Sequence, residues 1–284
     1  MFAPSHFLPL TLVFMSIWNH LLCSARMSFI HTKCRITDAP YSKTKDVFRA
    51  LVPDNKVKWN VDWSEYSPKN YTDPNTIGKP YADKNIDEGD FRWNAVDGSI
   101  NRKSHICDYS FDKDGRPLNP MGRTGLSGRG VLGKWGPNHA ADPLVTRYQN
   151  GRLEFVAIQR GDTGEWAIPG GMVDPGEKVS QTLKREFTEE ALNGVADASS
   201  LEDLWKHGRE LYKGYVDDPR NTDNSWMETV LMNFHDKDNV LQGVKLAAGD
   251  DATNLRWIDV DSEFPLYASH DHFISLLKQS RPPT

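Results

Sequence analysis

The chain has few cysteines and no long apolar run. Among its 284 residues there are only three cysteines, Cys23, Cys34 and Cys107, too few for a disulfide-rich scaffold and spaced like no tetrahedral zinc motif. Its most apolar stretch, residues 7–18, is interrupted by proline and serine and falls short of the roughly 20 apolar residues that span a bilayer. We therefore expect no stable membrane insertion.

The chain also lacks a surplus of positive charge. Lys and Arg number 34 against 39 Asp and Glu, a formal net charge of −5, so nothing attracts the protein generally to phosphate backbones. Neither a GxGxxG nor a GxxxxGK[ST] motif occurs. We expect no nucleic-acid partner, and we expect a monomer.

Acidic residues are missing from the first 35 positions, which end with Arg26, Lys33 and Arg35. This composition predicts a targeting segment over residues 1–35. A mitochondrial presequence fits it, and a secretory signal stays open although the first charged side chain, Arg26, follows the apolar stretch. Translation from Met27 would omit most of the segment and leave the protein in the cytoplasm.

Residues 36–125 are rich in turn-forming pairs and aromatic side chains and are predicted to form a smaller, irregular, β-containing domain. Trp59, Val61 and Trp63 alternate with polar neighbours, as in a half-buried strand. Glycines then recur from Gly122 to Gly136, as in a phosphate-binding loop or a mobile linker. We place the boundary there, with a second domain over residues 126–284.

The second domain shows regular patterns. Strands are predicted at residues 144–148, 153–158, 211–216, 228–234 and 255–260, and helices at residues 179–192 and 272–278. Strands that bracket helices in this order favour an α/β or α+β sandwich.

The predicted helix at residues 179–192 carries a cluster of carboxylates. Glu186 lies three and four positions before Glu189 and Glu190, so all three share one face and repel one another. A hard cation, Mg²⁺ or Mn²⁺, would offset that repulsion. A solvated acidic face is the common alternative, but it does not explain the preceding glycine turns, where a backbone carbonyl such as that of Gly170 can join the metal shell.

The stretch from Gly171 to Glu190 resembles the Nudix box, G-x5-E-x7-R-E-U-x-E-E-x-G-U, where U is bulky and apolar. The matching residues are Gly171, Glu177, Arg185, Glu186, Phe187, Glu189 and Glu190. The last two positions depart from the pattern, with Leu192 and Asn193. The resemblance implies the Nudix α/β/α sandwich and hydrolysis of a nucleoside diphosphate linked to another moiety.

Within the family, residues 122–126, 136–143, 165–177 and 215–224 resemble the mitochondrial ADP-ribose pyrophosphatases and the related domain of the ADP-ribose-gated cation channel. The resemblance implies ADP-ribose as substrate, with AMP and ribose 5-phosphate as products. It points to Asp142, Asp218, Arg220 and His270 for substrate binding. In the channel domain the Arg-Glu pair of the box is altered, whereas Arg185 and Glu186 are intact here.

Roles in catalysis follow as hypotheses. Glu186, Glu189 and Glu190 hold the metal, and Glu189, Glu190 or Asp251 takes the proton of the attacking water. Arg185 orients the neighbouring glutamates. Two other functions stay open: a sensor that binds ADP-ribose without cleaving it, and a Nudix hydrolase of another nucleoside diphosphate derivative.

Overall fold

The computed structural model describes residues 30–192, 201–242 and 252–282. Its centre is a seven-stranded mixed sheet with the path β11-β6-β5-β10-β9, beside which β8 pairs with β5 and β7 with β6. The strands are β5 (Gly136–Gln149), β6 (Arg152–Arg160), β7 (Trp166–Ala167), β8 (Gly171–Met172), β9 (Arg209–Tyr215), β10 (Ser225–His235) and β11 (Ala252–Asp259).

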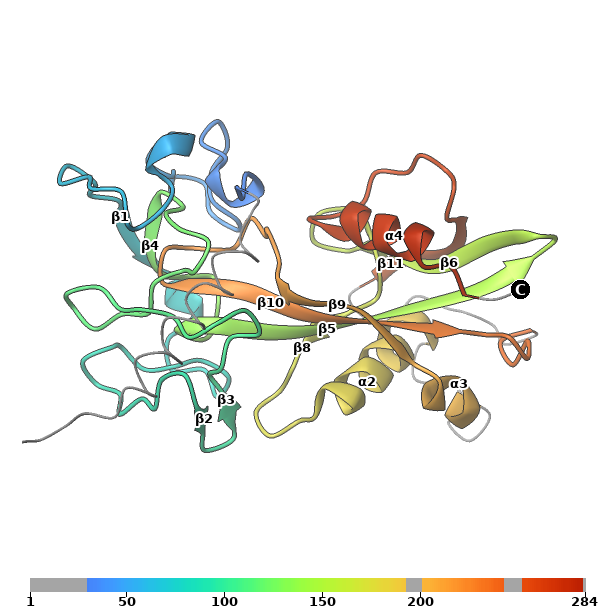
Figure 1. Ribbon diagram of the computed structural model, residues 1–284. Coiled ribbons are helices and arrows are strands. Elements are labelled where there is room, and N and C mark those ends of the chain that lie inside the picture. The colour runs from blue at the N-terminus through green and yellow to red at the C-terminus, as the bar shows by residue number, and fades with distance from the viewer. Residues whose placement is uncertain (1–29, 193–200, 243–251, 283–284) are drawn as a thin grey trace, which may run out of the picture.

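Helices cover both faces of this sheet. Figure 1 shows α2 (Val179–Leu192) and α3 (Glu202–Lys206) on one side and α4 (His270–Gln279) on the other. Side chains along β5 point alternately to the two faces of the sheet and contribute to a hydrophobic cluster on each face. Ala140 and Leu144 belong to the cluster that includes α4, while Ala141 and Val145 belong to the cluster that includes α2. The predicted α/β/α sandwich is confirmed.

Helix α2 has the predicted limits, because its apolar stripe of Leu183 and Phe187 is buried against the sheet. All five predicted strands form. Strand β5 is much longer than predicted and starts at Gly136, including Pro143 within it. The sequence pattern does not predict a strand at residues 136–143, because an almost fully buried strand shows no alternation of polar and apolar residues.

The sheet opens in its middle. Strand β5 pairs with β6 only from Thr146 to Gln149, and with the short β8 at Ala140 and Ala141. Between these points β5 and β6 are not paired with each other. Residues 168–171 run across this gap from β7, which pairs with β6, to β8, which pairs with β5. This separation creates the place where the candidate site lies.

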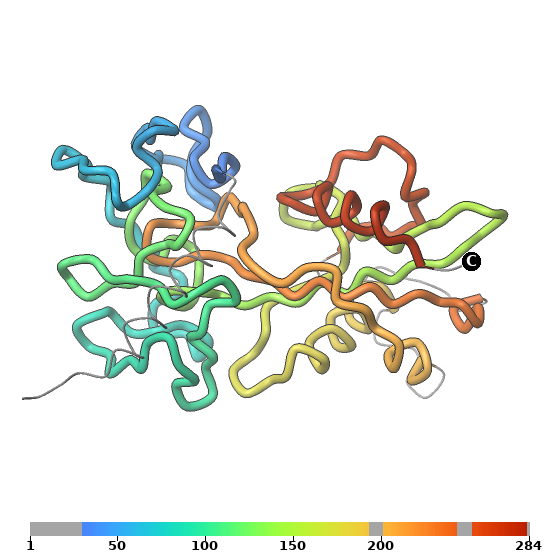
Figure 2. Tube along the Cα trace, viewed as in Figure 1, coloured from blue at the N-terminus to red at the C-terminus, as the bar shows by residue number. Residues whose placement is uncertain are grey.

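The N-terminal part, the described residues 30–135 that precede β5, lies at one end of β5 and β10, as the blue-to-green tube in Figure 2 shows. It contains two small sheets: β1 (Lys69–Thr72) with β4 (Leu126–Gly130), and β2 (Val96–Asp97) with β3 (Ile100–Asn101). Single 3-10 turns lie at η1 (Lys33–Arg35), η2 (Asp54–Lys56) and η3 (Pro74–Thr76). The irregular, β-containing character is as predicted.

The strand predicted at residues 59–63 is wrong. That segment is turn and bend, because its aromatic rings and backbone carbonyls surround a cation rather than a neighbouring strand. The Arg123 guanidinium lies 4.9 Å from the Trp59 ring centre and donates to the carbonyl oxygens of Lys58 and Val61 at 2.7 and 3.1 Å.

The glycine-rich segment 122–136 is a packed part of the fold and not an exposed linker. It includes the buried strand β4, and its glycines permit close backbone packing. A Cβ on Gly125, where φ is +84°, would lie 2.1 Å from the carbonyl oxygen of Ala50, so only glycine fits.

Residues 30–35 do not behave as a detached leader. His31 and Cys34 are fully buried, and the Asp217 carboxylate accepts hydrogen bonds from the backbone N–H groups of Thr32, Lys33 and Cys34 at 2.7, 2.9 and 3.0 Å. Residues 30–35 are therefore held against the second domain by a polar anchor, while the extent of the targeting segment stays a prediction. Within the described ranges no helix has the length and apolar character to cross a membrane.

Candidate active site

A pocket opens on the α4 side of the sheet where β5 and β6 part. Its lining includes the four residues expected to bind substrate and, from the box region, Gly170 and Glu190 among others. The polar side chains of the lining are those of Asp142, Arg160, Glu190, Asp218, Arg220, Thr229, Tyr267 and His270. Segments more than a hundred residues apart thus meet in one cavity.

Asp218 and Arg220 form a paired unit at the pocket wall. Nε and one terminal nitrogen of Arg220 donate to the two oxygens of Asp218 at 2.8 and 2.7 Å, and the Arg220 backbone N–H adds a third bond at 2.8 Å. Although burial opposes ionisation, the guanidinium keeps the pKa of Asp218 below its usual value. The pair is therefore a rigid, polar edge with remaining donors on Arg220.

His270 begins helix α4 and is fixed in one tautomer. Its Nδ1 accepts the backbone N–H of Ile168 at 2.9 Å, which leaves the proton on Nε2 as a donor. Burial and the nearby Arg160 lower the pKa of His270 to about 3. The neutral ring also ties α4 to the turn before the box.

Arg160 and Tyr267 were not found from the sequence. The Arg160 guanidinium lies 4.4 Å from the centre of the Tyr267 ring and pairs with the partly exposed Asp162 at 2.8 Å. Both side chains line the pocket. Nothing in the local pattern marks them, because Arg160 ends an ordinary strand and Tyr267 lies in an irregular segment.

Glu190 reaches the turn at the pocket floor. Its Oε2 accepts the Gly170 backbone N–H at 2.8 Å, and burial raises its pKa to about 8. Nearby, Asp142 accepts the Thr229 hydroxyl at 2.6 Å, and burial raises the pKa of Asp142 to about 6. Two desolvated carboxyl groups therefore border the same small space, where a cation would favour their charged forms.

Arg185 lies among the other carboxylates of the box. It donates to Glu177 from Nε at 3.0 Å and to Glu189 at 3.0 Å, and it pairs with Glu186 at 2.8 Å. It also donates to the Met172 carbonyl oxygen at 3.1 Å. The hydrogen bonds that Arg185 donates to Glu177, helped by one from the Thr182 hydroxyl, lower the pKa of Glu177 to about 2. The orienting role of Arg185 stays a prediction, which these contacts support.

The carboxylates of the box offer the oxygen ligands that a hard cation prefers, but the three expected to bind it are not close together in this structure. Burial raises the pKa of Glu186 to about 7, and a Cβ on Gly171 would lie 2.3 Å from its carboxylate, so the glycine makes room for that group. Glu189 is more than half exposed. Among the described residues, Glu186, Glu189 and Glu190 do not meet within 4.8 Å as a set of three, since Arg185 holds two of them.

Most of the loop from Asp217 to Asn224 is structural. Asp217 anchors residues 32–34, Asn221 donates to the Val216 carbonyl at 2.7 Å, and Asp223 accepts from Tyr66 at 2.6 Å. Only Asp218 and Arg220 of this loop line the pocket. Asp251, a candidate proton acceptor, lies outside the described residues.

Two family profiles match the chain. The profile described as the NUDT9-like N-terminal domain matches residues 52–136, and the profile described as the NUDIX domain matches residues 137–277. Together with the relatives below, they show that the chain belongs to the Nudix hydrolase family.

Three relatives extend over most of this chain. A Caenorhabditis elegans protein named as a nudix hydrolase is 63% identical over 258 residues, 89% of this chain and 99% of its own length. The mitochondrial ADP-ribose pyrophosphatase of Rattus norvegicus is 48% identical over 278 residues, 88% of this chain and 78% of the relative. A transient receptor potential cation channel subfamily M member-like 2 of Nematostella vectensis is 48% identical over 281 residues, 89% of this chain but 18% of the channel protein.

Proposed function

We propose that this protein hydrolyses the pyrophosphate of ADP-ribose to AMP and ribose 5-phosphate in the presence of Mg²⁺. The observation that carries the proposal is that one pocket joins Asp218, Arg220 and His270 to Glu190 and Gly170 of the box region. Similarity to the rat ADP-ribose pyrophosphatase supports the substrate.

The pocket offers suitable chemistry for such a substrate. Arg160 and Arg220 supply cationic donors for a diphosphate. Asp218 and Asp142 supply acceptors, and the Nε2–H of His270 supplies a donor, for sugar hydroxyls and phosphate oxygens. Apolar residues such as Ile158, Ile168 and Phe273 complete the lining, so water is partly excluded around these polar groups.

In the reaction a water oxygen bonds to one phosphorus atom, and the bond between that phosphorus and the bridging oxygen breaks. Mg²⁺, when bound, neutralises diphosphate charge and orients the water. Glu186, Glu189 and Glu190, with the Gly170 carbonyl, are the residues we propose to hold it. Glu189, Glu190 or Asp251 accepts the proton of the water, while Arg185 positions Glu186 and Glu189.

Similarity to the mitochondrial ADP-ribose pyrophosphatase of the rat favours a mitochondrial location for this protein. The absence of acidic residues from its first 35 positions also suits a mitochondrial presequence. Imaging of a tagged full chain beside a variant lacking residues 1–26 tests this proposal. Mitochondrial signal only in the full chain supports it.

The test of activity is AMP release from ADP-ribose by the full chain, with and without Mg²⁺. NADH and a diadenosine polyphosphate serve as comparison substrates. Glu186→Gln should abolish turnover, because it removes one charge from the metal-binding set. Glu263→Gln, a matched change at an exposed glutamate, should leave turnover unchanged.

Other outcomes define the alternatives. Tight ADP-ribose binding without any AMP release would make the protein a sensor. The similarity to part of the Nematostella vectensis cation channel is the reason to test for this role. Preferred cleavage of NADH or the diadenosine compound would retain the hydrolase and replace its substrate. Wild-type activity in Glu186→Gln would remove that residue from the mechanism.

A further inference from the structure

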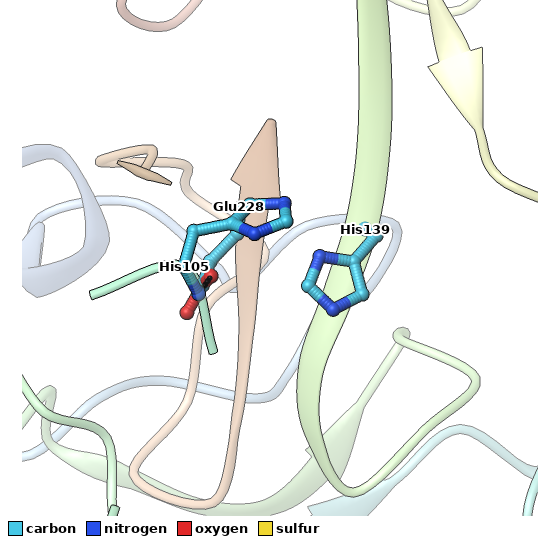
Figure 3. Close-up of side chains that lie close together, drawn as sticks. All are labelled: His105, His139 and Glu228. Atoms are coloured by element: carbon cyan, nitrogen blue, oxygen red, sulfur yellow. Dashed lines mark hydrogen bonds between the residues drawn. The ribbon is translucent and has the colours of Figure 1, made fainter. Parts of the chain in front are cut away.

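A second group of metal-binding side chains lies apart from the box glutamates. His105, His139 and Glu228 place one ligand atom each within 4.8 Å of the others. Figure 3 shows that the two imidazole rings and the carboxylate converge from three segments: the N-terminal part, β5 and β10. No short motif links these positions, so only the fold brings them together.

Sheet register fixes two of the three ligands. Strands β5 and β10 are parallel, and His139 stands directly opposite Glu228. Side chains at paired positions leave the same face of a sheet. The third ligand is attached to this pair, because the His105 backbone N–H and the Ser104 hydroxyl both donate to the Glu228 carboxylate, the latter at 2.6 Å.

Glu228 is a fully buried acid without an ion-pair partner among the described residues. Hydrogen bonds from Ser104, His105 and the Trp226 indole, the last at 2.8 Å, partly offset its burial. They occupy three of about four acceptor directions on a carboxylate, so one direction remains for a further ligand.

The two histidines have buried nitrogens that lack good partners. Nε2 of His105 and both ring nitrogens of His139 have no hydrogen bond of normal geometry within the described part of the chain. Burial lowers the pKa of His139 to about 4, although weak hydrogen bonding with the backbone of Lys103 and Asn101 opposes this shift. The rings lie 4.5 Å apart between centres, and neutral imidazole is the form that binds metal.

We propose that His105, His139 and Glu228 bind a divalent transition-metal ion of the zinc class. Two imidazole nitrogens and one carboxylate oxygen form a common zinc donor set, with water as fourth ligand. Zn–N and Zn–O distances near 2.1 Å place tetrahedral ligands about 3.4 Å apart. Small rotations of the two rings close the present spacing.

This site would fasten the N-terminal part to the catalytic sheet. His105 belongs to the former, and His139 and Glu228 to the latter. The His139 carbonyl oxygen also accepts the Val173 backbone N–H at 2.9 Å, directly after β8. Metal binding there therefore stabilises the border between the two parts beside the box. Lys134 and Lys213 lie near enough to repel a cation, which limits the affinity.

The test is calorimetric titration of the full chain with Zn²⁺ in excess Mg²⁺, so that the box glutamates are already saturated with magnesium. We expect one equivalent of Zn²⁺ to bind and the Tm to rise. His105→Ala and His139→Ala should each weaken binding at least about tenfold and remove the rise in Tm. His207→Ala, at an exposed histidine, is the matched control and should behave like the wild type.

Co²⁺ gives a second readout that needs no variant. Four-coordinate Co²⁺ with nitrogen ligands absorbs strongly in the visible range, whereas octahedral Co²⁺ with oxygen ligands does not. An intense band that Zn²⁺ abolishes and Mg²⁺ leaves intact supports the site. Zn²⁺ binding of equal strength in the wild type and both alanine variants, or a weak octahedral spectrum, overturns the proposal and leaves a neutral histidine pair packed around Glu228.

Discussion

The backbone N–H of Gly170 donates a 2.8 Å hydrogen bond to the Glu190 carboxylate, 20 residues further along the chain. Gly170 also has no room for a side chain: an added Cβ would lie 2.2 Å from an Asp142 oxygen and 2.9 Å from the Ala141 carbonyl oxygen. The turn before the box, strand β5 and helix α2 therefore fix one another at this glycine.

Gly170→Ala should lower the turnover number at least tenfold and destabilise the fold by about 1–3 kcal/mol, because the Cβ displaces Asp142 and the turn. Steady-state assays and urea unfolding measure the two effects. Gly164→Ala is the control, since Gly164, whose φ is +72°, has open space around its Cβ. It should lose some stability and keep its turnover number; equal turnover in both variants would contradict the argument.

Arg160→Ala should raise the KM for ADP-ribose by about tenfold to a hundredfold, the loss expected for hydrogen bonds to a charged phosphate. Arg160→Lys should recover part of the loss, because a single ammonium keeps charge without the planar fork. Arg256→Ala removes an arginine that covers the Trp166 ring instead, at 4.4 Å, and should leave the KM unchanged. Identical KM values for Arg160→Ala and the wild type would exclude Arg160 from binding.

Asp217→Ala should destabilise the protein by about 2–4 kcal/mol, because it leaves three backbone N–H groups of residues 32–34 without their acceptor. Urea unfolding at constant pH provides the measurement. Asp54→Ala removes only the exposed carboxylate that pairs with Arg35 and should change stability little. If the two substitutions had equal effects, residues 30–35 would not be part of the cooperative fold.

His31→Gln should reduce the pH dependence of stability between about pH 4 and pH 6.5. Burial lowers the pKa of His31 to about 4, below its unfolded value of about 6.5. The folded state then binds fewer protons than the unfolded state in this range, so its stability is present above pH 6.5 and is lost as pH falls toward 4.

The size of this effect is at most about 1.4 kcal/mol per pH unit for one proton. Urea unfolding of wild type, His31→Gln and His207→Gln at several pH values measures it. Other buried histidines add slopes of the same sign, so the difference between variants is the informative quantity. A His31→Gln slope equal to those of the other two proteins would show that His31 is not buried as a neutral ring.

Local pattern was sufficient for the elements that carry the box. The helix at residues 179–192 and the five strands follow from apolar periodicity, and the seven box positions place Arg185 beside the glutamates that it contacts. Periodicity fails at residues 59–63, where alternation arises from aromatic packing around Arg123. It also fails for the start of β5, which is buried on both faces.

The sequence by itself determined the family, the sandwich and the carboxylate helix, because these depend on residues a few positions apart. The tertiary structure alone decided that Arg160 and Tyr267 line the pocket, that residues 30–35 are anchored by Asp217, and that His105 meets His139 and Glu228. Each of these contacts joins side chains whose separation along the chain carries no periodic signal. They form only where β5 and β6 part or where β5 and β10 are held in register.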